Sequence, residues 1–384
     1  MNLTKFKIIL LSVSITVLFS CIEEYTPRIE AVESNKYVVS GLLSTEDEYQ
    51  IISVSLASEI NDPKLKPLND CEVKISDIKG NIFNGYEFES GKYKVRIPED
   101  NLITGVKFKL DIITPAGTNL VSEYEELLEC PDIDSVYYLR ENKPTNTPDI
   151  FIKGIQFYIN LDATDFENTY YKFDIEETWE YHSMYPLEWY YDGTVHHIYP
   201  PDYSNSVCWK TEKIKDIYIL NTTGLQNNKY KEYPLHFVDN TTSRLAYIYS
   251  ILIKQYAISK EAFSFWDQLR VNNVEQGGLY ETQPVMVNGN LSNLTNPKQS
   301  VLGYFQVASV KTKRIFITEI QDLELNYDPG CGKFQLKVGL REFSPQDYPV
   351  YLLIDLHNFA ELTPECIFCT LLGGTMTKPD YWPD

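Results

Sequence analysis

Cys21 is the residue whose place in the chain most clearly predicts a chemical role. It follows an amino-terminal stretch that holds Lys5 and Lys7, no acid, and then an apolar run over residues 8–19. This is the order of a secretory signal. The run is too short to cross a membrane as a helix, which takes about 20 apolar residues.

The residues around Cys21 resemble a lipobox. Leu18 stands three places before the expected cleavage point, Ser20 just before it and Cys21 just after, while Phe19 is bulkier than is usual there. We therefore expect a signal peptide over residues 1–20 and a lipid anchor on the Cys21 sulfur. The alternative is an ordinary secreted protein with a cysteine near its cleavage point.

Six further cysteines remain after Cys21. An even remainder in an exported chain favours disulfides, and we expect all six to be oxidised. The closely spaced Cys366 and Cys369 could instead form a zinc or redox site, but the nearest histidine is the lone His357 and no βαβ unit surrounds them. As a cystine they would form a tight local ring, and the pairing overall stays open. The disulfide candidates are Cys71, Cys130, Cys208, Cys331, Cys366 and Cys369.

Two pairs of adjacent residues could in principle do acid–base or metal chemistry. They are Glu176 with Glu177, and His196 with His197. Adjacent residues of a strand point to opposite faces, so neither pair is expected to act on one substrate or one metal ion. The chain also lacks GxSxG, HExxH, P-loop and EF-hand signatures. We expect no enzyme activity, no metal ion and no cofactor.

The chain is acidic, with a formal net charge of −20 at pH 7. Loss of residues 1–20 removes two lysines and no acid, which leaves −22. Such a surface repels nucleic acid and anionic lipid, so nucleic acid is excluded as a partner. A hydrophobic content of 43% can build a core, which excludes a disordered chain.

Residues 21–36 are expected to form a lipidated tether to the membrane. The stretch is charged and has no periodicity, and Glu23 and Glu24 follow the lipid site closely. Acidic residues at this place resemble the surface-export signal of Bacteroidota lipoproteins. A merely solvated acidic linker is the equal alternative.

Residues 37–130 alternate between apolar and polar side chains, for example over residues 71–75 and 106–112. This alternation gives a strand one buried and one wet face. Short strands separated by turn residues favour an immunoglobulin-like β-sandwich. Cys71 falls with the apolar set and is expected inside.

Residues 131–384 are expected to form a larger β-rich domain with one or two short helices, so the fold class is mainly β. One helix begins with Ser259 as its N-cap and has Glu261 in its first turn. Among the expected strands are residues 170–181 and 334–341.

Residues 182–209 break the strand pattern and carry many aromatic rings among prolines. Such a loop is a candidate contact surface, because Trp and Tyr combine a large rigid area with a polar tip. The rings could also belong to the domain core. The consecutive Trp189, Tyr190 and Tyr191 cannot all face one interior in an extended segment. The candidate contact residues are Tyr185, Trp189, Tyr190, Tyr191, Tyr199 and Tyr203.

Several segments, taken in order, resemble a known family. Among them are residues 170–181, 208–210, 283–290 and 366–374. Together they resemble a family of Bacteroidota lipoproteins that is defined only as a domain of unknown function. The resemblance includes the first domain, which is similar to carboxypeptidase-regulatory-like sandwiches. Members are typically encoded near TonB-dependent outer-membrane receptors, and the family offers no catalytic or ligand residue to carry over.

The resemblance implies a location at the outer membrane, on the cell surface, and a TonB-dependent receptor as partner. We expect a non-catalytic lipoprotein that captures or caps a ligand or stabilises the receptor. A surface adhesin or host-interaction module is the alternative, and a surface hydrolase is a further one. The sequence leaves the ligand open.

Overall fold

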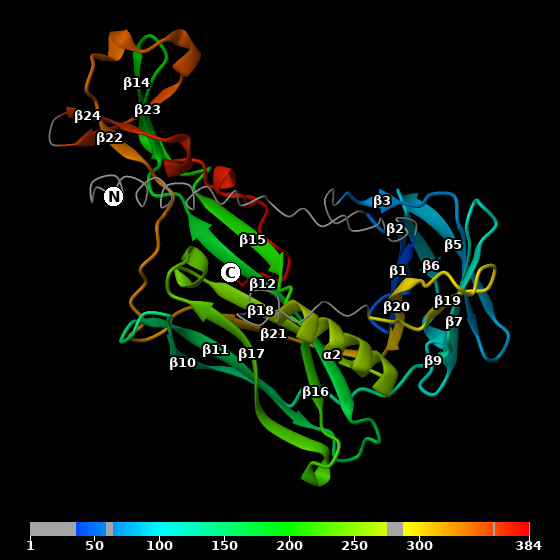
Figure 1. Cartoon of the computed structure of the whole chain (residues 1–384). Coiled ribbons are helices and arrows are strands. Elements are labelled where there is room, and N and C mark those ends of the chain that lie inside the picture. Colours follow the sequence, from blue (N-terminus) through cyan, green and yellow to red (C-terminus); the bar gives the residue numbers. More distant parts are fainter. Residues whose placement is uncertain (1–35, 59–63, 275–286, 356–357, 384) are drawn as a thin grey trace, which may run out of the picture.

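The computed structural model describes residues 36–58, 64–274, 287–355 and 358–383 of the chain. Within these ranges the protein is mainly β, as expected, with one α-helix (Figure 1). The expected signal peptide, Cys21 and nearly all of the expected tether lie outside the described residues. No helix in the described ranges is long and apolar enough to cross a membrane.

The first region forms an 11-stranded, sandwich-like sheet, which we call the sandwich. The expected alternation is confirmed in β4, where Val73 and Ile75 are buried while Glu72 faces solvent. Together the inward side chains form one core. The strands of the first region are β1 (Tyr37–Ser44), β2 (Tyr49–Leu56), β3 (Lys66–Pro67), β4 (Glu72–Asp77), β5 (Ile82–Glu89), β6 (Lys92–Arg96), β7 (Lys107–Ile113), β8 (Asn119–Ser122) and β9 (Glu125–Glu126).

Two strands from much later in the chain complete the sandwich. β20 (Leu302–Ala308) pairs in parallel with β1, and β19 (Leu291–Asn293) pairs with β8. Gly303 has φ +98°, and a Cβ there would lie 1.9 Å from the Val39 carbonyl oxygen. Only glycine permits this approach. A domain boundary at residue 130 therefore leaves two strands of this sheet out.

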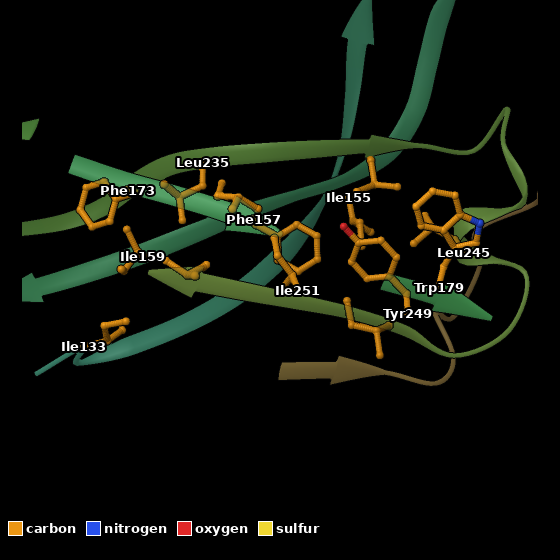
Figure 2. Close-up of a cluster of buried hydrophobic side chains, with 14 of the residues drawn as sticks. Ile133, Ile155, Phe157, Ile159, Phe173, Trp179, Leu235, Leu245, Tyr249 and Ile251 are labelled. Atoms are coloured by element: carbon orange, nitrogen blue, oxygen red, sulfur yellow. The ribbon is translucent and has the colours of Figure 1, made fainter. Parts of the chain in front are cut away.

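The second unit, which we call the body, comprises residues 131–182, 207–274, 309–330 and 369–383. Its two sheets enclose a large core, in which the rings of Phe157 and Tyr249 stack at 5.8 Å (Figure 2). One sheet contains β10 (Ser135–Pro144), β11 (Phe151–Asp162) and β17 (Lys229–Asp239); the other contains β12 (Tyr170–His182), β15 (Val207–Lys213), β16 (Tyr218–Asn221), β18 (Tyr249–Ala257) and β21 (Val310–Ile317).

Helix α2 (Lys260–Val274) joins the body to the sandwich. The Ser259 hydroxyl oxygen accepts a hydrogen bond from the Ala262 N–H at 3.0 Å, which confirms the expected N-cap. The buried side of α2 packs against β20, and the Trp266 indole N–H donates to Gln306 Oε1 of β20 at 2.6 Å. The helix therefore fixes the late strand β20 against the body.

The third unit, which we call the knob, comprises residues 183–206 and 331–368. Figure 1 shows it standing away from the sheets of the body. Its five-stranded sheet overturns the expectation of a long loop over residues 182–209, because two of its strands lie there. In sheet order the strands are β14 (Val195–Asp202), β13 (Leu187–Tyr191), β23 (Val350–Asp355), β24 (Asn358–Leu362) and β22 (Lys333–Gln335).

The expected strand over residues 334–341 is wrong beyond Gln335. β22 ends there, and a short 3-10 turn follows in which Glu342 Oε1 accepts the Gly339 N–H at 3.2 Å. The 3-10 turns of the described chain are η1 (Glu99–Asn101), η2 (Gln226–Asn228), η3 (Ser243–Leu245), η4 (Leu340–Glu342), η5 (Pro345–Asp347), η6 (Pro364–Cys366) and η7 (Cys369–Leu372).

Candidate contact surface

The hairpin of β13 and β14 is built on a three-residue turn. The Asp192 N–H donates to the Thr194 carbonyl oxygen at 3.2 Å, and Gly193 adopts φ +109°. Asp192 Oδ1 accepts the Thr194 N–H at 3.4 Å. An Asp-Gly pair between two apolar runs is a recognised hairpin signal, and it could have identified this hairpin from the sequence.

Two aromatic–imidazole stacks lie on opposite faces of this hairpin. The Trp189 and His197 rings lie 3.8 Å apart and nearly parallel, and the Tyr190 and His196 rings lie 4.5 Å apart. The expectation that the adjacent histidines face opposite ways is therefore confirmed. Each pair joins two strands through flat ring contact, which stiffens the hairpin.

Each of these histidines also faces a carboxylate. His196 Nε2 lies 2.8 Å from Asp192 Oδ1, and His197 Nε2 lies 3.6 Å from Glu188 Oε1. The hydrogen bond from His196 holds the pKa of Asp192 below its usual range. Both contacts are half-exposed to solvent, so they orient the rings more than they stabilise the fold.

The six candidate contact residues divide between the knob core and its surface. Tyr191 is only 5% exposed and packs edge-on against Tyr348 at 5.4 Å, so its assignment as a contact residue is wrong. Tyr185 packs against a small core of the knob formed by Leu362, Cys366 and Ile367. Trp189 and Tyr190 are half-buried. Tyr199 and Tyr203 are open, with 85% and 63% of their surface exposed.

Two disulfides stabilise the knob and the segment that follows it. Cys331 and Cys366 join within the knob, and Cys208 of β15 joins Cys369 of η7. The expected local ring between Cys366 and Cys369 is therefore wrong, because each pairs with a distant cysteine. The Tyr181 hydroxyl donates to the Cys369 carbonyl oxygen at 2.8 Å, which holds η7 against the body.

Cys71 and Cys130 carry free thiols, so the expectation that all six cysteines are oxidised is wrong for these two. Cys130 is buried against the core of the body, and its Sγ contacts the Gln255 carbonyl oxygen at 3.3 Å. Burial raises the pKa of the Cys130 thiol to about 11. Cys71 is half-buried beside the sandwich core rather than enclosed in it, and burial raises its thiol pKa as well.

A cavity of about 200 Å³ lies in the body, beside the places where the chain passes into the knob after His182 and Gly330. Trp179, Tyr181, His182 and Lys210 are among its lining residues. His182 Nε2 is bonded to Glu180 Oε1 at 2.7 Å, so this imidazole already has a partner.

A larger cavity, about 620 Å³, lies between the sandwich and the body. Charged groups that line it are engaged in ion pairs, with Lys254 Nζ 2.5 Å from Glu46 Oε1 and Arg314 Nη2 3.2 Å from Glu176 Oε1. Among the described residues, no group of three His, Cys, Asp or Glu side chains could hold a metal ion.

Glu177 is a buried acid that the sequence pattern did not reveal. The residue is 1% exposed, its carboxylate lies 3.2 Å from the Arg244 guanidinium, and it accepts a hydrogen bond from the Tyr249 hydroxyl at 2.8 Å. Burial raises the pKa of this carboxyl, but the His236 imidazole 3.4 Å from Glu177 Oε2, the Arg244 charge and the Tyr249 hydroxyl outweigh it and hold the pKa below its usual range. Glu177 therefore joins the two sheets of the body.

A family model described as a domain of unknown function (DUF4249) matches residues 22–314. The match ends within β21, so β22 to β24 of the knob lie beyond it. No curated protein matches the chain.

Two solved structures give only distant matches. Trypsin-activated alpha-2-macroglobulin from Escherichia coli is 11% identical, over 59% of this chain and 15% of that one, with a TM-score of 0.18. A DUF4785 family protein from Legionella pneumophila is 10% identical, over 56% of this chain and 51% of that one, with a TM-score of 0.16. Scores this low support no conclusion about fold or function.

Proposed function

The chain belongs to the DUF4249 family of unknown function, and on that premise we propose that it is a non-catalytic, lipid-anchored outer-membrane protein that assists a TonB-dependent receptor. In this proposal the anchor is Cys21, and the knob binds the receptor. The protein would then cap or capture a ligand at the receptor, or stabilise its outer face.

The observation that carries the proposal is the construction of the knob. Its two small cores and the Cys331–Cys366 disulfide hold a sheet that stands off the body, and the sheet leaves Tyr199 and Tyr203 open to solvent (Figure 1). A rigid surface loses little conformational entropy on binding. Exposed tyrosine rings are also typical anchors of protein interfaces.

The disulfides support an extracytoplasmic location. Cystines form and persist in oxidising compartments and are rare in the cytosol. Cys208–Cys369 and Cys331–Cys366 therefore agree with the export that the amino-terminal sequence predicts.

Recovery of a partner from solubilised outer membranes tests the proposal. The tagged full-length protein, extracted in mild detergent, should recover an outer-membrane barrel. Tyr199→Ala with Tyr203→Ala should lose most of that recovery, because both rings are exposed and their removal should leave the fold intact. Tyr86→Ala is the matched control, since Tyr86 is similarly exposed on the sandwich. Equal recovery by all three proteins, or no barrel with the unchanged protein, would contradict the proposal.

A further inference from the structure

The β10–β11 hairpin extends beyond the sheet to which it belongs. β11 pairs with β17 only from Gly154 onward, whereas β10 and β11 remain paired with each other as far as Pro144 and Phe151. The Thr145 N–H then donates to the Ile150 carbonyl oxygen at 3.0 Å and closes the turn. The tip is therefore an ordered two-stranded ribbon that no third strand accompanies.

Three consecutive large apolar residues are exposed at this tip. Ile150 and Phe151 are each 55% exposed, and Ile152 is 38% exposed. Successive side chains of a strand point to opposite faces, so the ribbon is apolar on both faces near its turn. Contiguous exposed apolar surface of this kind marks a contact with a partner or a membrane.

Cationic side chains border the apolar tip, although the chain as a whole has a net charge of −20. Lys143 stands directly opposite Ile152 in the hairpin register, and Lys153 follows Ile152. The Lys143 ammonium lies 4.2 Å from the centre of the Phe237 ring. Lysine stems can lie along apolar surface while their ammonium groups reach phosphate. With Asp149 in the turn, residues 143–153 carry a net charge of +1, which is complementary to the phosphates of lipid headgroups.

The small size of the apolar tip favours a lipid surface over a protein as its occupant. A stable protein interface uses roughly 20–30 residues on each side. A bilayer needs only a few apolar side chains when a lipid chain already holds the protein, because stable membrane attachment takes two weak signals. Repulsion between the acidic surface and anionic lipid is screened beyond about 8 Å at physiological ionic strength.

We propose that the β10–β11 tip inserts shallowly into a lipid bilayer, with Ile150, Phe151 and Ile152 at the acyl boundary and Lys143 and Lys153 at the phosphates. The inference rests on the proposed lipid anchor, which supplies the first attachment. In Figure 1 the hairpin lies on one side of the molecule and the sandwich on the other. Attachment at both places would fix how the protein lies on the membrane and where the knob points.

Fluorescence quenching by brominated lipid tests the insertion. The mature protein carrying Phe151→Trp is reconstituted into vesicles of equal parts phosphatidylethanolamine and phosphatidylglycerol, and the emission of the unchanged protein is subtracted. The added emission should shift to the blue, and bromine on the upper acyl chain should quench most of it. Tyr203→Trp is the matched control, because that site is exposed on the knob, and it should show neither effect.

A second set of variants separates insertion from misfolding. Ile150→Ser with Ile152→Ser should abolish most of the quenching of Phe151→Trp without lowering the melting temperature, because both side chains are exposed. Unshifted and unquenched emission in the anchored protein would overturn the inference. A shift that appears only when an outer-membrane barrel is present would also overturn it, since the tip would then bind protein. If the chain carries no lipid, the anchor proposal fails, and quenching by added vesicles then decides the hairpin alone.

Discussion

Glu177 shows how one buried acid can hold two sheets together. Glu177→Gln removes the charge that compensates Arg244, and breaking a buried pair on one side costs about 3–5 kcal/mol. We expect a loss near the lower end, about 3 kcal/mol, because Arg244 keeps a second partner in Asp239 at 2.9 Å. Urea unfolding measures this. Glu176→Gln is the control: its pair with Arg314 is more exposed, and its loss should be about 1 kcal/mol. Equal losses would contradict the assignment.

The same carboxylate should make stability depend on pH. Its folded pKa lies below the usual value, so its stabilisation is present above the unfolded pKa of about 4.3 and is lost as pH falls through the folded pKa. The difference in unfolding free energy between the unchanged protein and Glu177→Gln should therefore shrink as the pH falls below about 5. A difference that stays constant over this range would show that Glu177 is not the titrating group.

At the scale of elements, the β13–β14 hairpin carries one tyrosine that packs in the core of the knob and another that is exposed to solvent. Tyr191→Ala empties a buried site in the knob, and the loss of a large buried ring costs about 3 kcal/mol. Tyr199→Ala, on the same hairpin but exposed, should change stability by less than about 0.5 kcal/mol. Limited proteolysis should cut the knob of the first variant faster and leave the second unchanged. Similar cutting of both would mean that Tyr191 does not hold the knob together.

The elements that sequence reasoning found are those with local signals. Alternation identified several strands of the first region, such as β4 and β7, and a capping serine identified α2. The prediction of a long aromatic loop was wrong because Pro200, Pro201 and the many aromatic rings were taken as signs of irregular structure. The Asp192-Gly193 pair, which is typical of a hairpin turn, was overlooked. The burial of Glu177 was missed because acidic side chains usually face water. Glu177 instead lies on the face of β12 that Phe173 and Ile175 bury in the core.

At the scale of the whole molecule, the Cys208–Cys369 disulfide links strand β15 to the carboxyl-terminal segment. A bridge across 161 residues restricts the unfolded chain strongly, by about 5 kcal/mol in the chain-entropy account. Cys208→Ser with Cys369→Ser should lower the unfolding free energy by several kcal/mol in non-reducing urea titrations. Cys71→Ser, which removes a free thiol, is the control and should have little effect. A small loss in the double variant would mean that packing alone holds η7.

Long-range pairing is the part of the architecture that the sequence could not reveal. Nothing near Leu302 indicates that β20 lies beside β1, because that pairing depends on the fold of everything between them. The disulfide pairing could not be predicted for the same reason. Residue types marked Cys208 and Cys366 as disulfide candidates, but only the assembled sheets bring each to its partner.

The division of the knob between two distant segments determines when it can form. Strand β13 has β14 beside it at once, but its other neighbour, β23, lies far downstream, with Trp189 opposite Leu352. In the export that we propose, the amino-terminal part of the chain emerges first, so the rings of the β13–β14 hairpin stay uncovered until β23 has also emerged. The sheet of the sandwich is likewise incomplete until β20 is available to pair with β1. Such non-local topologies fold slowly, and loss of residues 331–368 would leave the β13–β14 hairpin exposed to proteases.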